Sequence, residues 1–196
     1  KTRKNIFLLP NVFVGFSNSN LNISFETENF TWSQNFLFNE KIKILSNENI
    51  KVKIEDNKII FNQTDYNGQV LFKDGNLENV TVIFNGDSQI KNNDFKKPIT
   101  GCVTFYNLSI SNLNFISNNA NCEDALNIVK SKGNIKSIKI NNSASDALDV
   151  DFSDLKINSI TINEAKNDCV DFSYGNYSVN HVSSKNCGDK GISIGE

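Results

Sequence analysis

A repeat of 22 residues in the C-terminal half of the chain constrains the fold more than any other feature. Four related phrases occur in order, and their apolar residues align when each phrase is moved by 22 positions. The two apolar columns of this strand are Leu126, Leu148, Val170, Ile192 and Ile128, Val150, Phe172, Ile194. A second strand repeats in the same way, with the columns Leu113, Ile135, Ile157, Val179 and Ile116, Ile138, Ile160, Val182.

A period of this length is typical of one coil of a parallel β-solenoid. Neighbouring coils stack about 4.8 Å apart, so residues one period apart form ladders and share a continuous core. No segment shows a 3.6-residue apolar pattern with helix caps. The sequence therefore predicts an all-β fold, a right-handed parallel β-helix (solenoid) with coils of about 22 residues.

Outside the regular repeat, the sequence predicts less regular parts of the same solenoid. The aromatic-rich residues 1–35 are expected to form an N-terminal cap and the first irregular coils, because the end of a solenoid exposes a strand edge. Residues 36–196 are expected to form the coils, with a polar loop insertion at about 86–99. The last phrase reaches Glu196 without a cap, so we expect either missing C-terminal coils or another chain covering the open end.

Composition excludes some classes of partner. The 20 basic and 22 acidic residues give a net charge of −2, and no clustered positive face is visible, which argues against binding to nucleic acid. No apolar run reaches the roughly 18 residues of a membrane span. The 34 asparagines alternate with apolar residues and are interpreted as turn residues between strands.

The four cysteines are expected to be free and mostly buried thiols. Cys169 and Cys187 fall on adjacent coils but about four positions out of step, so their Cα separation is expected to exceed the disulfide limit of about 7 Å. Cys102 and Cys122 are the only pair that the register leaves open as a disulfide.

Polar residues form two columns beside the apolar ones. The first column is Asp124, Asp146, Asp168 and Lys190, and the second, three residues on, is Asn127, Asp149, Asp171 and Ser193, with Asp151 beside it. Stacked carboxylates repel, which raises their pKa values unless something compensates. Three interpretations stay open. The aspartates could cap turns by accepting backbone N–H bonds. Calcium could be bound at Asp124, Asp146 and Asp168. A carbohydrate-binding or catalytic groove could use Asp149, Asp151, Asp171 and Ser193 as ligand-binding residues.

Several of these phrases resemble a known kind of repeat. The segments 100–106, 123–127, 145–149 and 188–196 are similar to the right-handed β-helix region of bacterial surface proteins, which often accompanies a CotH-type kinase-like domain. The resemblance implies the fold and an extracellular or cell-surface setting. It implies no established chemistry, and this chain has no Gly-rich phosphate loop and no His-Arg-Asp segment.

A second resemblance concerns chemistry. Asn167-Asp168-Cys169-Val170 followed by Gly191-Ile192-Ser193-Ile194-Gly195 is similar to two phrases of polygalacturonases, which are inverting glycosidases on a β-helix. It implies Asp146 and Asp168 as candidate catalytic carboxylates. Lys190 stands where those enzymes have histidine, and it would be the proton-accepting base if the chain acted as a β-helix lyase. Asn167 replaces one of their paired aspartates, so the catalytic set is incomplete.

The sequence therefore leaves three function classes open. The favoured class is a non-catalytic surface or extracellular β-helix module that faces carbohydrate or matrix, or serves as a structural spacer. The alternative is a polysaccharide-acting enzyme, a lyase or hydrolase, that uses the stacked Asp/Lys column. The third class is a module that assembles end to end through its open coil.

Overall fold

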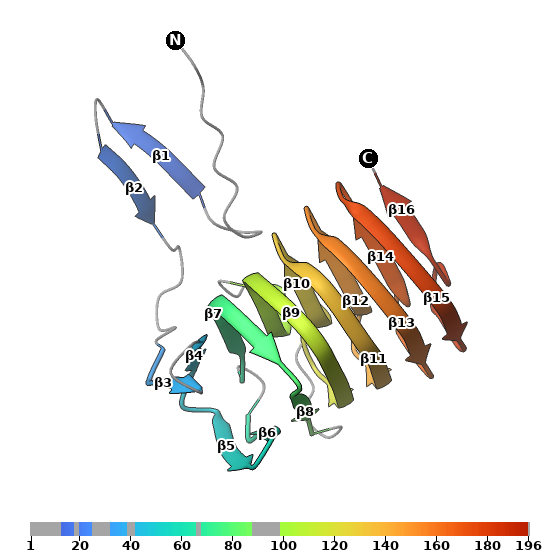
Figure 1. The fold of residues 1–196 in the computed structure, drawn as a ribbon, viewed down its shortest axis with the longest axis horizontal. Helices are drawn as coiled ribbons and strands as arrows, with labels where there is room; N and C mark the ends of the chain where they lie inside the picture. Colours follow the sequence, from blue (N-terminus) through green and yellow to red (C-terminus); the bar gives the residue numbers. More distant parts are fainter. Residues whose placement is uncertain are drawn as a thin grey trace.

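The computed structural model describes residues 13–17, 20–24, 32–38, 42–65, 68–87 and 99–195, and in these residues the regular structure is entirely β (Figure 1). Within the described residues, no helix is long and apolar enough to cross a membrane. The first eight strands are β1 (Phe13–Ser17), β2 (Asn20–Ser24), β3 (Gln34–Phe38), β4 (Ile42–Ser46), β5 (Ile50–Glu55), β6 (Lys58–Gln63), β7 (Val70–Glu78) and β8 (Thr81–Asn85). The later strands are β9 (Gly101–Ala120), β10 (Asp124–Val129), β11 (Lys132–Ser143), β12 (Asp146–Asp151), β13 (Asp154–Ile162), β14 (Val170–Ser173), β15 (Asn176–Ser184) and β16 (Ser193–Gly195).

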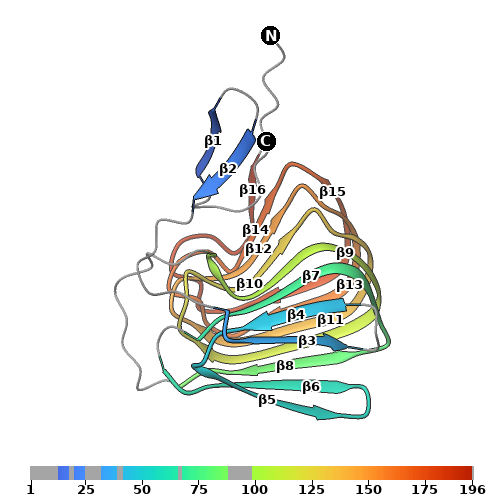
Figure 2. The same cartoon turned by 90° about the vertical axis from the view of Figure 1, so that its left-hand side faces the viewer.

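The later strands form a parallel stack. The long strand β9 is followed by three coils of two strands each, and the strand order β15-β13-β11-β9-β10-β12-β14-β16 shows that alternate strands lie side by side. Figure 2 shows these coils overlapping one behind another. Stacked strands lie about 23 residues apart in a solenoid of about five turns. The predicted all-β parallel solenoid is confirmed.

The observed register matches the sequence columns with one local difference. Leu126 pairs with Leu148, which pairs with Val170, as the 22-residue spacing predicts. On the second strand, Ile138 pairs with Phe115 rather than with Ile116. The ladder shifts at an irregularity between Gly133 and the residues after it, so one coil is a residue longer there.

The N-terminal strands join the stack less regularly. The pairs β3–β4, β4–β7 and β5–β6 are antiparallel, whereas β6–β8, β7–β9 and β8–β9 are parallel. Val70 pairs with Val103, 33 residues later, so an insert lies between these two coils. Most of the predicted loop at 86–99 lies outside the described residues. Most of the predicted cap at 1–35 also lies outside them, and β1 and β2 pair with each other as an antiparallel hairpin.

The core is a continuous stack of apolar side chains. Phe61, Phe72, Phe105 and Phe115 are fully buried, and successive rings meet edge to face with centroids 5.0 to 6.0 Å apart. This is the geometry that aromatic quadrupoles favour. The aromatic stack carries the core from the irregular coils into the regular ones.

Asparagine ladders explain much of the unusual composition. The side-chain amide of each member donates to the Oδ1 of the member on the preceding coil, with N···O distances of 2.5 to 3.0 Å. The longest ladder contains Asn62, Asn85, Asn118, Asn141 and Asn163. Other asparagines, including Asn107 and Asn112, take the left-handed backbone conformation with φ of 54°, which asparagine tolerates better than most residues.

The cysteine prediction is wrong, because both pairs form disulfides. Cys102 is bonded to Cys122 and Cys169 to Cys187, each with a Cα–Cα distance of 5.4 Å. The prediction treated the residues between Cys187 and the next coil as extended chain. They instead form a turn in which Gly188 N–H donates to Ala165 O, and this turn brings Cys187 back toward Cys169.

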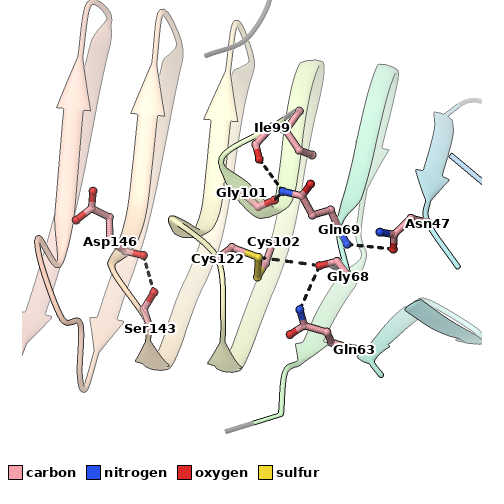
Figure 3. The surroundings of a disulfide bond; sticks show 10 residues. All are labelled: Asn47, Gln63, Gly68, Gln69, Ile99, Gly101, Cys102, Cys122, Ser143 and Asp146. Atoms are coloured by element: carbon pink, nitrogen blue, oxygen red, sulfur yellow. Dashed lines mark hydrogen bonds between the residues drawn. A yellow bond between two sulfur atoms is a disulfide. The ribbon is translucent and has the colours of Figure 1, made fainter. Parts of the chain in front are cut away.

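The Cys102–Cys122 disulfide lies beside a buried polar network (Figure 3). The Gln69 amide donates to the carbonyl oxygens of Ile99 at 2.6 Å and Gly101 at 3.1 Å. The carbonyl oxygen of Gly68 lies 4.0 Å from the Cys122 sulfur. These contacts join the irregular N-terminal strands to the first regular coil.

Candidate functional site

The predicted catalytic carboxylates are engaged in a ladder with the backbone. Asp146 Oδ1 accepts the N–H of Asp168 at 2.8 Å and the side-chain amide of Asn167 at 2.7 Å. Asp168 Oδ1 accepts the N–H of Lys190 at 2.8 Å. Each carboxylate thus holds the start of the following coil, which is the turn-capping interpretation of this column.

Lys190 is held by neighbouring carboxylates. Its ammonium group contacts Asp189 and lies 3.5 Å from Asp168 Oδ2. The hydrogen bond from Asp189, helped by the charge of Asp168, raises the pKa of Lys190. A lysine base needs a lowered pKa near the working pH, so this environment favours a structural ion pair.

The second polar column runs along β10, β12 and β14. Asn127 pairs with Asp149, Asp149 with Asp171, and Asp171 with Ser193, so the predicted ligand-binding residues occupy successive coils as expected. The Asn127 amide donates to Asp149 Oδ2 at 2.9 Å. On the preceding coil, β9 places the buried Thr104 in the same column.

The carboxylates around this column perturb one another strongly. Burial, followed by the charges of Asp151, Asp171 and Asp146, raises the pKa of Asp149 from 3.8 to about 8. Burial also raises the pKa of Asp151, with a further contribution from Asp171. Asp124 is only 3% exposed, and burial together with Asp149 raises its pKa well above the usual value.

Several buried oxygen atoms at this place have no hydrogen-bond partner. They are Asp124 Oδ2, Asn127 Oδ1, Asp171 Oδ1 and Thr104 Oγ1. Buried polar atoms in native proteins are normally paired, so each exception calls for an explanation. All but the hydroxyl are pure acceptors, so the column lacks donors.

The calcium prediction at Asp124, Asp146 and Asp168 finds no support in the geometry. Asp146 and Asp168 already accept N–H bonds through Oδ1. Within the described ranges, no group of three or more His, Cys, Asp and Glu side chains is arranged to hold a metal ion.

The sequence analysis missed an exposed aromatic corner. Phe152 and Tyr174 lie between the strands of successive coils and stack with centroids 5.1 Å apart and ring planes within 3°. They are 47% and 60% exposed, and both have positive φ values. Their spacing of 22 residues is the signal that could have identified them.

A shallow cavity of about 470 Å³ adjoins this corner. We call it the corner groove, and its lining comes from the first residues of β11, β13 and β15. The lining residues are Gly133, Asn134, Asp154, Leu155, Lys156, Asn176, Tyr177 and Ser178. Asn134, Lys156 and Ser178 occupy equivalent positions on three successive coils, so the groove presents a polar row along the stack.

No protein-family model, curated protein or solved structure matches the chain. The resemblances to CotH-associated β-helices and to polygalacturonases therefore stay hypotheses based on short phrases.

Proposed function

We propose that this chain is a non-catalytic, exported β-solenoid module that binds a polysaccharide or a similar extended matrix polymer. The observation that carries the proposal is the corner groove, where polar side chains recur on three successive coils beside the exposed rings of Phe152 and Tyr174. Polar groups placed around apolar surface are the usual composition of a small-molecule binding site.

The spacing of the groove suits a repeating ligand. Asn134, Lys156 and Ser178 are one coil apart, and coils stack at about 4.8 Å, close to the length of one sugar residue. Tyr177 adds a fixed ring to the lining, because its hydroxyl donates to Ser173 O at 2.8 Å. A polymer lying along the stack would meet the same chemistry at each step.

Two features support the exported and non-catalytic parts of the proposal. Structural disulfides persist mainly in oxidising compartments such as the cell exterior, and this chain has two. Asp146 and Asp168, the candidate catalytic pair, accept backbone N–H bonds as structural groups do.

One observation favours the enzymatic alternative. Asp149, with a pKa raised to about 8 beside Asp151 and Asp171, has the property that a general acid needs in glycoside hydrolysis. The alternative is thus a hydrolase that uses Asp149 rather than the predicted Asp146 and Asp168.

Binding and turnover of neutral oligosaccharides separate these functions. We expect saturable binding by calorimetry and no new reducing ends after long incubation. Exchanging both Lys156 and Ser178 for alanine is expected to weaken binding at least tenfold, whereas the control Lys139→Ala, on the exposed part of β11, is expected to leave it unchanged. Equal binding by both variants contradicts the groove as the site, and reducing ends that disappear in Asp149→Asn establish the hydrolase instead.

A further inference from the structure

The described residues bring six carboxyl groups to one place, which we call the acidic face: Glu123, Asp124, Asp146, Asp149, Asp151 and Asp171. Asp149 interacts electrostatically with Asp146, Asp151 and Asp171, and Asp124 interacts with Glu123, Asp146 and Asp149. Among the described residues, no lysine or arginine contributes to the pKa of Asp124, Asp146, Asp149 or Asp151. The face therefore lacks a cation.

Unpartnered buried oxygens point into the same face. Asn127 is fully buried, and its amide nitrogen donates to Asp149, which leaves its Oδ1 without a donor. Asp124 Oδ2, on a side chain that is 3% exposed, and Asp171 Oδ1 are unpartnered as well. An unpaired buried acceptor costs about 1–3 kcal/mol relative to a paired one, so a ligand that brings donors and positive charge satisfies both deficits.

We propose that the acidic face binds the ammonium groups of an amino-sugar polymer, with Asp149 and Asp171 as the paired acceptors. This inference depends on the proposed polysaccharide binding for its choice of polymer, but it uses a face that precedes the Phe152 and Tyr174 corner rather than the corner groove that follows it.

The spacing of the coils suits an ammonium group. Equivalent oxygens on Asp149 and Asp171 are expected about 4.8 Å apart. A nitrogen placed slightly off the line between them reaches both at the roughly 2.8 Å of a charge-assisted hydrogen bond. Its third N–H remains for a further acceptor, and Asp151, whose pKa is affected by Asp171, is the nearest candidate.

An ammonium ion fits this face better than a metal ion does. Calcium takes six to eight oxygen ligands, whereas no described group of three metal-ligating side chains is arranged around an ion. An ammonium group needs only three acceptors. The like charges also disfavour polyuronates, so the face discriminates amino sugars from acidic ones.

Calorimetry with matched oligosaccharides tests the proposal. The probes are fully deacetylated glucosamine oligomers, N-acetylated oligomers of the same length, 1,4-diaminobutane and calcium chloride. We expect the deacetylated oligomers to bind at least tenfold more tightly than the acetylated ones, and we expect the diamine to compete for the site. Binding should release protons at pH 7, because an ammonium group lowers the pKa of Asp149; runs in buffers of different ionisation enthalpy measure this release.

Isosteric variants locate the site. Asp149→Asn and Asp171→Asn are expected to abolish the preference for the deacetylated oligomer and the proton release. The control Asp56→Asn, in the turn between β5 and β6, is expected to preserve both. Equal binding of acetylated and deacetylated oligomers overturns the ammonium site but leaves the polysaccharide proposal intact. Calcium binding without amine binding, or a preference that survives both variants, also overturns it. Binding of the diamine with no binding of any oligosaccharide overturns the polymer in this inference and contradicts the proposed function.

Discussion

Removing the Cys169–Cys187 disulfide is expected to destabilise the last two-strand coil by about 3 kcal/mol. The bond closes a loop with a sequence separation of 18 residues, and the chain-entropy relation assigns about 3 kcal/mol to a loop of that size. Alanine at both positions is the appropriate change, because Cys169 is fully buried and a serine hydroxyl would need a partner there.

Two assays are needed, because a solenoid need not unfold in one step. Thiol titration of the denatured, unreduced protein is expected to detect no free cysteine. Hydrogen exchange is expected to show faster local opening of β14 and β15 in the double-alanine variant, with β9 much less affected. Four reactive thiols, or a loss of stability of only a few tenths of a kcal/mol, would refute the argument from loop closure.

Two further predictions concern a charge and a turn. The free energy of unfolding should fall as pH rises from about 4 to about 8, because folded Asp149, with a pKa of about 8 against 3.8, holds a proton that the unfolded chain has lost. Asp149→Asn should flatten this slope, by up to about 1.4 kcal/mol per pH unit, whereas the exposed Asp154→Asn should not; an unchanged urea-denaturation slope refutes it. Gly175→Ala should cost about 1–3 kcal/mol by overpacking, since the new Cβ falls 2.2 Å from the carbonyl oxygen of Ser153. Gly191→Ala, with its nearest atom at 3.4 Å, should be tolerated, and equal melting temperatures for the two variants contradict the steric reasoning.

The period of the sequence predicted which residues stack, because every strand repeats its apolar positions. It could not predict how the chain turns within a coil. Cys187 lies near Cys169 only through such a turn, and Phe115 replaces Ile116 in its column only through an irregularity in the ladder. These features depend on local backbone conformation, which a repeat of apolar residues does not encode.

The polar columns show the same division for the site. Their register followed from spacing alone, so Asp149, Asp171 and Ser193 align as expected. The different environments of the two columns did not follow from the sequence: Asp168 receives a backbone N–H, whereas Asp171 keeps an unpartnered oxygen. That difference is set by the direction of nearby turn amides, which is visible only in three dimensions.

The asparagine ladder makes the number of coils an adjustable quantity. Each rung donates one amide and accepts another, so a member such as Asn141 presents the same bonding surface upward and downward. A duplicated copy of residues 143–164, placed after the original, would bring its own asparagine, strands and corner, and would lengthen the protein by about 4.8 Å. Because each disulfide closes within a single coil, neither would be interrupted. The protein is thus built to vary in reach by whole steps, and duplication of a short stretch of coding sequence is sufficient to supply one.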